Sequence, residues 1–125
     1  MQLNHVTVRA HDVRAAMAFY QTLGFKLIVD AAPRYVRFEA PEGENTLSIE
    51  QSWETRVGPG PLIFLECAAL DAMVRRLESV GIVFDSPPTD EPWLWREARL
   101  RDPAGNALCL YSAGPNRRFP PWRVA

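Results

Sequence analysis

The chain has 125 residues, a length typical of one domain built around one hydrophobic core. Hydrophobic residues make up 47% of it and charged residues 23%, which is the composition of an ordinary globular domain. The formal net charge of −1 gives no general attraction to nucleic acid or to an anionic membrane, so neither is expected as a partner. No apolar run approaches the ~20 residues that a membrane-spanning helix needs. Cys67 and Cys109 lie in apolar strand-like runs, which favours reduced thiols and a cytoplasmic location.

One pattern occurs twice, at an offset of 57 residues. Each copy begins with a β-branched or apolar stretch that predicts a strand and continues with a helix pattern: residues 3–9 and 12–23, then 62–67 and 70–80. The apolar residues of both helix patterns recur at i, i+3, i+4, i+7 and i+10, which places them on one face. Gly24 and Gly81 end the two patterns, as a left-handed C-terminal residue does. The common offset indicates an internal duplication.

The remaining segments complete the two copies. Further strands are predicted at residues 25–29, 34–40, 46–51, 82–84, 93–101 and 107–112. The proline-rich stretch 85–92 predicts a loop, and residues 102–106 a tight turn. The tail after residue 112 is too rich in proline for a helix and is expected to be extended.

We therefore predict an α+β fold of two tandem βαβββ units that form a half-open β-cup, with the helices on the convex side. Residues 1–125 would form a single domain, with repeat 1 at about 2–52, a linker at 53–61, repeat 2 at about 62–112 and the tail at 113–125.

Several motifs resemble those of one known superfamily. They are the stretch Asn4-His5-Val6-Thr7-Val8, the run from Phe19 to Phe25, Leu70-Asp71-Ala72, and the turn from Asp102 to Leu108. In these motifs the chain resembles the vicinal oxygen chelate superfamily, which includes glyoxalase I, bleomycin-resistance proteins and extradiol dioxygenases. The resemblance covers nearly all of residues 2–112 and does not identify an activity within the superfamily.

The resemblance implies a candidate metal site. In metal-using members of the superfamily, four strand residues hold one divalent ion, and these positions fall on His5, Glu50, Leu62 and Cys109. His5 and Glu50 match the usual ligands, and these donors suit Zn, Ni, Mn, Co or Fe. Leu62 has no lone pair, and Cys109 would bind only as a thiolate. His11, in the loop before the first helix pattern, is expected to be a solvated or capping residue.

Glu97 is a second candidate catalytic carboxylate beside Glu50. If Trp95, Glu97 and Arg99 face the cup, Glu97 replaces the missing ligand or acts as a base. A slip of one residue would turn it to the other face. The alternative is a surface glutamate paired with Arg96 or Arg99.

Aromatic residues supply candidate ligand contacts. Trp53, Phe64, Trp93 and Trp95, together with Leu62 and Cys109, are expected to line the pocket for a planar or apolar ligand. The alternative for the aromatic rings is packing between the two halves or at a dimer interface.

These observations leave three functions open. The first is a small-molecule-binding cup that acts as a metal-dependent lyase, isomerase or dioxygenase with an incomplete ligand set, in which the ion polarises a carbonyl. The second is a metal-free protein that sequesters an aromatic or antibiotic-like compound. The third is an oligomeric subunit with no small-molecule chemistry. The resemblance further implies a homodimer.

Overall fold

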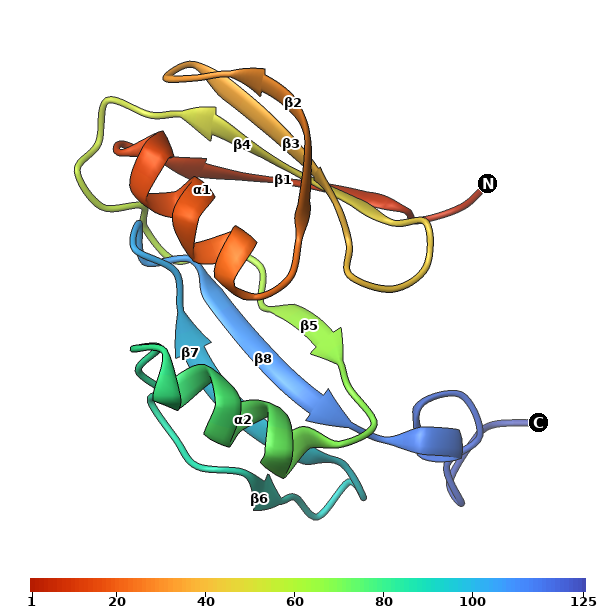
Figure 1. Cartoon of the computed structure of the whole chain (residues 1–125). Coiled ribbons are helices and arrows are strands. Elements are labelled where there is room, and N and C mark those ends of the chain that lie inside the picture. Colours follow the sequence, from red (N-terminus) through yellow and green to blue (C-terminus); the bar gives the residue numbers. More distant parts are fainter. The chain divides into compact units, whose positions relative to one another are not determined.

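The computed structural model describes all residues from 1 to 125 (Figure 1). The first set of elements is β1 (His5–Ala10), α1 (Val13–Thr22), β2 (Lys26–Ala31), β3 (Tyr35–Glu39) and β4 (Thr46–Gln51). The second set is β5 (Ile63–Glu66), α2 (Leu70–Ser79), β6 (Thr89–Asp90), β7 (Arg96–Arg101) and β8 (Ala107–Ser112). A short 3-10 helix, η1 (Gly114–Arg117), follows β8.

The chain divides into two compact units. The first unit contains residues 1–61 and 102–106, and the second contains residues 62–101 and 107–125. The first sheet has the strand order β1-β4-β3-β2 and the second the order β5-β8-β7-β6, and neither closes into a barrel. In both sheets the first pair, β1–β4 or β5–β8, is parallel and the other pairs are antiparallel. The predicted α+β fold of two βαβββ units is therefore confirmed.

Local sequence explains where α1 begins and ends. The Asp12 carboxylate accepts a hydrogen bond from the backbone N–H of Ala15 at 3.0 Å and so caps the helix, as expected for an N-cap residue. Gly24 follows the helix with φ +100°, a conformation that other residues rarely adopt. The buried residues of α1 pack on the apolar face of the first sheet, which is formed mainly by Val36, Phe38, Leu47 and Ile49.

The second unit repeats this arrangement with a weaker N-cap. Ala69 precedes α2 and supplies no side-chain hydrogen bond. The buried residues of α2 pack on an apolar sheet face made of Ala98, Leu100, Leu108 and Leu110. On that same face Arg96 of β7 binds Asp71 of α2 through Nε at 2.8 Å and Nη2 at 3.0 Å. Arg96 thus adds a surface ion pair to the apolar contacts between α2 and this face.

The turn between β7 and β8 belongs to the first unit, although both strands belong to the second sheet. Residues 102–106 connect β7 to β8, and the Asp102 carboxylate at their start is only 4% exposed. Tyr20 of α1 donates its hydroxyl hydrogen to Asp102 Oδ2 at 2.7 Å. The other donors to this carboxylate are the backbone N–H groups of Ala104 and Asn106 and the side-chain amide of Asn106. Burial, and then the charge of Asp102, raise the pKa of Tyr20 above its usual range.

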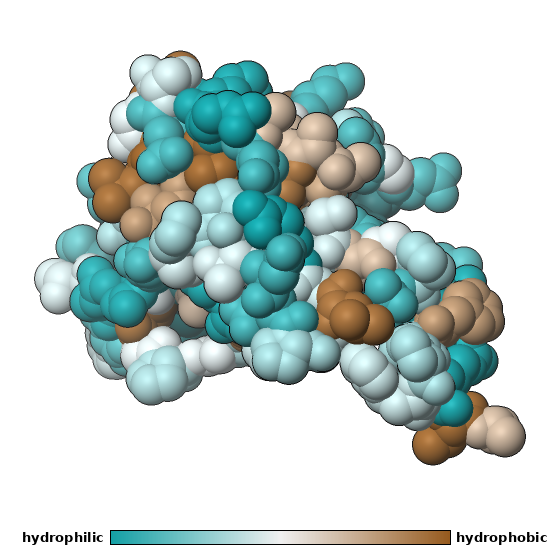
Figure 2. All heavy atoms as spheres, turned by 90° about the horizontal axis from the view of Figure 1, so that it is seen from below, coloured by the Kyte–Doolittle hydropathy of each residue, from teal (hydrophilic) through white to brown (hydrophobic).

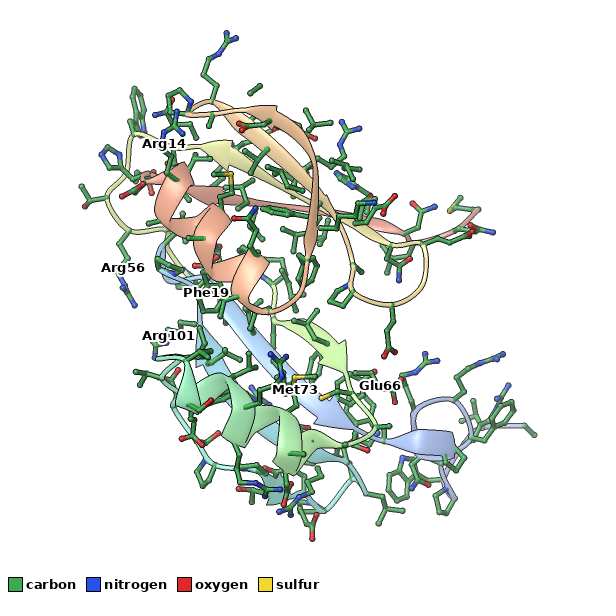
Figure 3. All side chains as sticks on the ribbon, viewed as in Figure 1. Arg14, Phe19, Arg56, Glu66, Met73 and Arg101 are labelled. Atoms are coloured by element: carbon green, nitrogen blue, oxygen red, sulfur yellow. The ribbon has the colours of Figure 1, made fainter.

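The glycine of this turn, Gly105, packs closely against Arg56. Gly105 has φ +96°, and a Cβ atom at this position would lie 3.1 Å from the guanidinium of Arg56. Arg56 comes from the connection that follows β4 (Figure 3), where Val57 also donates its backbone N–H to the Ala104 carbonyl at 3.1 Å. The positive φ favours glycine at this position, and the Arg56 side chain packs where a Cβ atom would stand.

Four predicted segments differ from the structure. The strand predicted at 82–84 is reduced to a single bridge between Phe84 and Leu100, and the predicted loop 85–92 contains the two-residue strand β6. The strand predicted from residue 93 begins at residue 96, because the chain turns at Leu94, which has φ +67°. The tail includes η1, since a proline is acceptable in the first turn of a short helix.

No helix in the structure is long and apolar enough to cross a membrane. Figure 2 shows hydrophobic residues in small separate groups among hydrophilic ones on the face seen from below. The large apolar side chains that are exposed include Trp53, Phe64, Trp93 and Trp122.

The Tyr20–Asp102 hydrogen bond yields a stability prediction. Tyr20→Phe should lower the free energy of unfolding by about 1.5–3 kcal/mol, because a buried carboxylate loses one of its donors. Urea denaturation measures this change. Tyr111→Phe is the matched control, since Tyr111 is also buried and its hydroxyl makes no hydrogen bond in the structure. Equal losses in the two variants would contradict the importance of the Asp102 contact.

Candidate functional site

The face of the first sheet that points away from α1 is polar. Three neighbouring strands contribute to it: His5 and Thr7 from β1, Thr46 and Ser48 from β4, and Tyr35 and Arg37 from β3. The register pairs His5 with Thr46 and Thr7 with Ser48, so these side chains lie in adjacent rows. Ser48 is fully buried, whereas His5 is exposed.

Hydrogen bonds join these side chains into a chain across the sheet. The Arg37 Nε–H donates to the Tyr35 hydroxyl at 2.8 Å, and that hydroxyl is hydrogen-bonded to Ser48 Oγ. Ser48 Oγ lies 3.1 Å from His5 Nε2, and His5 Nδ1 lies 2.6 Å from the Thr46 hydroxyl. The hydrogen bond from Ser48 lowers the pKa of Tyr35 below its usual range, and Arg37 adds to this effect against the opposing effect of burial. Both ring nitrogens of His5 are thus engaged by hydroxyl groups.

The strand register gives the metal-ligand positions a different assignment in the first unit. In the second unit Ile63 pairs with Leu108. Because the strands are parallel, the preceding residue Leu62 lies opposite Ala107, and Cys109 comes two residues after Ala107. In the first unit His5 lies opposite Thr46, and the residue two positions beyond is Ser48. Ser48, and not Glu50, therefore occupies the place equivalent to Cys109. Its contact with His5 agrees with this assignment.

Glu50 lies apart from His5. It pairs with Arg9, four residues along the strand from the row of His5, which corresponds to about 13 Å. Glu50 instead borders a groove of about 560 Å³ at the ends of β1 and β4. The groove is lined by Arg9, His11, Glu50, Gln51, Ser52 and Trp53. His11 Nδ1 donates to the Ser52 carbonyl at 3.0 Å, so this histidine has a structural partner in the groove.

On the second sheet the register settles the orientation of Glu97. Arg99 pairs with Cys109, which pairs with Phe64, and Glu97 pairs with Tyr111, which pairs with Glu66. All of these side chains share the face that points away from α2, which we call the open face of the second sheet. Glu97 therefore points to the same face as Cys109, as in the first of the two registers considered above.

Glu97 is a buried carboxylate with a full set of donors. It is 3% exposed, and its Oε1 accepts from Arg99 Nη2 at 2.7 Å and Nε at 3.2 Å. Its Oε2 accepts from the Trp93 indole N–H at 2.6 Å, and the Cys109 thiol lies 3.5 Å from Oε1. Burial opposes ionisation of Glu97, but the hydrogen bonds from Arg99, Trp93 and Cys109 outweigh it and hold the pKa below its usual range. These contacts suit a residue that positions its neighbours, and they occupy the oxygens that a base would need.

Cys109 does not offer a thiolate. Its side chain is fully buried, and burial together with the charge of Glu97 raises its pKa to about 12. At neutral pH the sulfur therefore keeps its proton and donates it toward Glu97.

The aromatic residues of the second unit form one cluster. Trp95 stacks on Tyr111 with ring centroids 4.7 Å apart, and Phe64 meets both rings edge to face at 5.6 and 5.4 Å. Leu62 packs against the same group. Phe64 remains 39% exposed and Trp93 42% exposed, so these two rings are accessible while Tyr111 is buried beneath. Trp53 belongs to the first unit and does not join the cluster.

The residues at the four metal-ligand positions do not fit a divalent ion. They are one histidine, a serine, a leucine and a protonated thiol, and a typical site needs at least three nitrogen, oxygen-anion or thiolate donors. No group of three or more His, Cys, Asp or Glu residues in the chain is placed to hold an ion.

The fold and these motifs agree with comparisons to known proteins. The family model for the glyoxalase/bleomycin resistance protein/dioxygenase superfamily matches residues 2–110, so the chain belongs to this superfamily. No curated relative matches by sequence. A glyoxalase/bleomycin resistance protein/dioxygenase from Nocardioides has a similar structure, with a TM-score of 0.76 and 23% identity over 100% of this chain and 90% of that one.

Two further solved structures illustrate the range of the fold. Lactoylglutathione lyase from Agrobacterium tumefaciens has a TM-score of 0.76 and 19% identity, over 94% of this chain and 96% of that one. A bleomycin-binding protein in complex with bleomycin has a TM-score of 0.72 and 22% identity, over 90% of this chain and 98% of that one. The TM-scores establish a shared fold, although the sequence identities are only 19% and 22%.

Sequence reasoning considered Tyr35 only as a stacking surface, missed Ser48 and Arg37 on the first sheet, and gave Arg99 and Tyr111 no binding role. Strand alternation carried part of the signal, because Ser48 shares a face with Glu50 and Tyr111 with Cys109. The register between β1 and β4 was the missing information.

The three tyrosines should titrate separately. Tyr35 should ionise below the ordinary value of about 10, whereas burial raises the pKa of Tyr20 and of Tyr111 above it. The near-ultraviolet absorbance of phenolate should therefore rise in two phases as the pH increases. Tyr35→Phe should abolish the early phase, and Ser48→Ala should move it to higher pH. An early phase that survives in Tyr35→Phe would contradict the hydrogen-bonded chain.

Proposed function

We propose that this protein binds a planar aromatic small molecule on the open face of its second sheet, without a resident metal ion. One observation carries the proposal: two exposed rings, Phe64 and Trp93, each lie against one member of the ion pair between Arg99 and the buried carboxylate of Glu97. Trp93 donates to Glu97, and the Arg99 guanidinium carbon lies 5.9 Å from the centre of the Phe64 ring. Side chains held in this way lose little freedom when a ligand arrives.

The surroundings of the two rings support the same function. Phe64 rests edge-on against Trp95 and Tyr111, so an arriving ring would meet a packed aromatic floor. Stacked aromatic pairs contribute about 0.5–1.5 kcal/mol beyond the area that they bury. Apolar walls with a few fixed polar groups are the usual composition of small-molecule sites. The bleomycin-binding protein that shares this fold was solved in complex with bleomycin, which is consistent with a role of this kind.

The alternative is a metal-dependent lyase, isomerase or dioxygenase that uses His5 and Glu50. It would require these two residues to converge on an ion, although they lie in rows about 13 Å apart in the sheet register. It would also need a third donor. The metal-free function requires neither change. A homodimer and a cytoplasmic location remain part of the proposal, and light scattering of the purified protein tests the first of them.

Phe64→Ala should weaken binding of the neutral probe 2-naphthamide by about 5–10-fold, because one stacking surface is lost. Isothermal titration calorimetry measures the dissociation constants. The matched control is Phe119→Ala, which removes an exposed phenylalanine of the C-terminal tail and should leave binding unchanged. A wild-type protein that does not bind the probe, or equal effects of the two variants, would refute this site.

Metal content gives a separate test of the alternative. After dialysis against Zn²⁺, Mn²⁺, Ni²⁺, Co²⁺ or Fe²⁺ and removal of free ions, elemental analysis should find far less than one ion per chain. Wild-type protein and the double variant His5→Ala, Glu50→Ala should give the same result. Stoichiometric metal that disappears in the variant would establish the metal-dependent alternative instead.

A further inference from the structure

We infer that the ligand of the open face is an aromatic carboxylate, with its ring on Phe64 and its carboxylate on the guanidinium of Arg99. This inference rests on the proposed function, because it assigns the ligand class of the same site. The residue that would bind the carboxylate, Arg99, is not one of the superfamily's four metal-ligand positions.

The orientation of Arg99 leaves part of its side chain accessible. Nε and Nη2 both donate to Glu97 Oε1, and the Cys109 side chain is a further hydrogen-bonding neighbour of the guanidinium. The planar group is thus held on one side by buried partners, while 43% of the Arg99 side chain stays exposed on the other. Its Cζ lies 5.9 Å from the centre of the Phe64 ring, so the exposed part of Arg99 and the exposed ring belong to one small area. A flat ligand with an acidic oxygen at its edge can contact both.

The two members of the ion pair differ sharply in exposure. The Arg99 side chain is 43% exposed and that of Glu97 only 3%. The negative member is therefore buried and surrounded by donors, while the positive member reaches the surface. Although the pair has no net charge, the charge that an approaching ligand meets first is positive. A charged donor of fixed orientation favours a carboxylate over an uncharged group of the same shape.

Other charges on this face do not reverse this preference. Glu66, at the end of β5, lies on the side toward the C-terminal segment (Figure 3), where its Oε1 is 3.9 Å from Arg117 Nε. Arg101, at the end of β7, binds Asp85 through Nε at 3.2 Å. Each of these groups has an opposite charge beside it. Arg99 is the cation of the face whose partner is buried beneath it.

Paired probes separate the charge from the ring. 2-Naphthoate and 2-naphthamide have the same aromatic system and nearly the same shape, and they differ in the negative charge. Calorimetry on the wild-type protein should show about tenfold tighter binding of 2-naphthoate, as expected when an ionic hydrogen bond replaces a neutral one. Arg99→Gln should abolish this preference, so that the two probes bind with equal affinity. Arg101→Gln, on the same strand, should keep the preference.

A second variant protects the test against misfolding. Arg99→Gln leaves Glu97 buried without its cation, and this can destabilise the protein. The double variant Glu97→Gln, Arg99→Gln removes both charges, and it too should bind the two probes equally. Circular dichroism confirms the fold of each variant before titration.

The outcomes distinguish this inference from the proposed function. If wild-type protein binds both probes equally, the site exists but the carboxylate preference is refuted. If neither probe binds, the proposed function itself fails. If the preference persists in both Arg99 variants, another cation recognises the carboxylate and the assignment to Arg99 is wrong.

Discussion

The buried carboxylate of Asp102 is the constraint on which the first unit depends. An ionised carboxylate removed from water is costly unless donors surround it, and four donors meet it here. One of them, the Tyr20 hydroxyl, comes from the buried face of α1. Asn106 contributes two and then uses its side chain to bind the Arg9 carbonyl at the end of β1. A turn between two strands of the second sheet thereby completes the core of the first unit.

Glu97 shows a different use of a buried carboxylate. Asp102 is satisfied by a hydroxyl and by amides, all uncharged donors, and serves the packing of its surroundings. Glu97 is satisfied in part by Arg99, which stays accessible, so the pair presents a positive group at the surface of the second sheet. The Trp93 indole is held by the same carboxylate. One buried anion thus orients both a cation and an aromatic ring, and this orientation is what the proposed binding function requires.

Much of the fold could be predicted from the sequence. The helix faces and their terminal glycines follow from short-range periodicity, the two repeated units follow from the common offset of 57 residues, and the structure confirms these predictions. The site was harder, because it depends on strand register. The family resemblance placed the second metal-ligand position on Glu50, whereas the pairing of β1 with β4 sets Thr46 opposite His5 and brings Ser48 into contact with it. The orientation of Glu97 depended on the same kind of information, as did the turn at Leu94 that shortens β7.

The Tyr20–Asp102 contact also has a consequence for how the protein is made. The two residues are 82 positions apart, so when α1 leaves the ribosome its buried hydroxyl has no partner until nearly the whole chain has been synthesised. The N-terminal half therefore cannot reach its final packing during translation and must wait for the last hairpin. A gene fragment that encodes only the first repeat should accordingly yield an incompletely folded polypeptide.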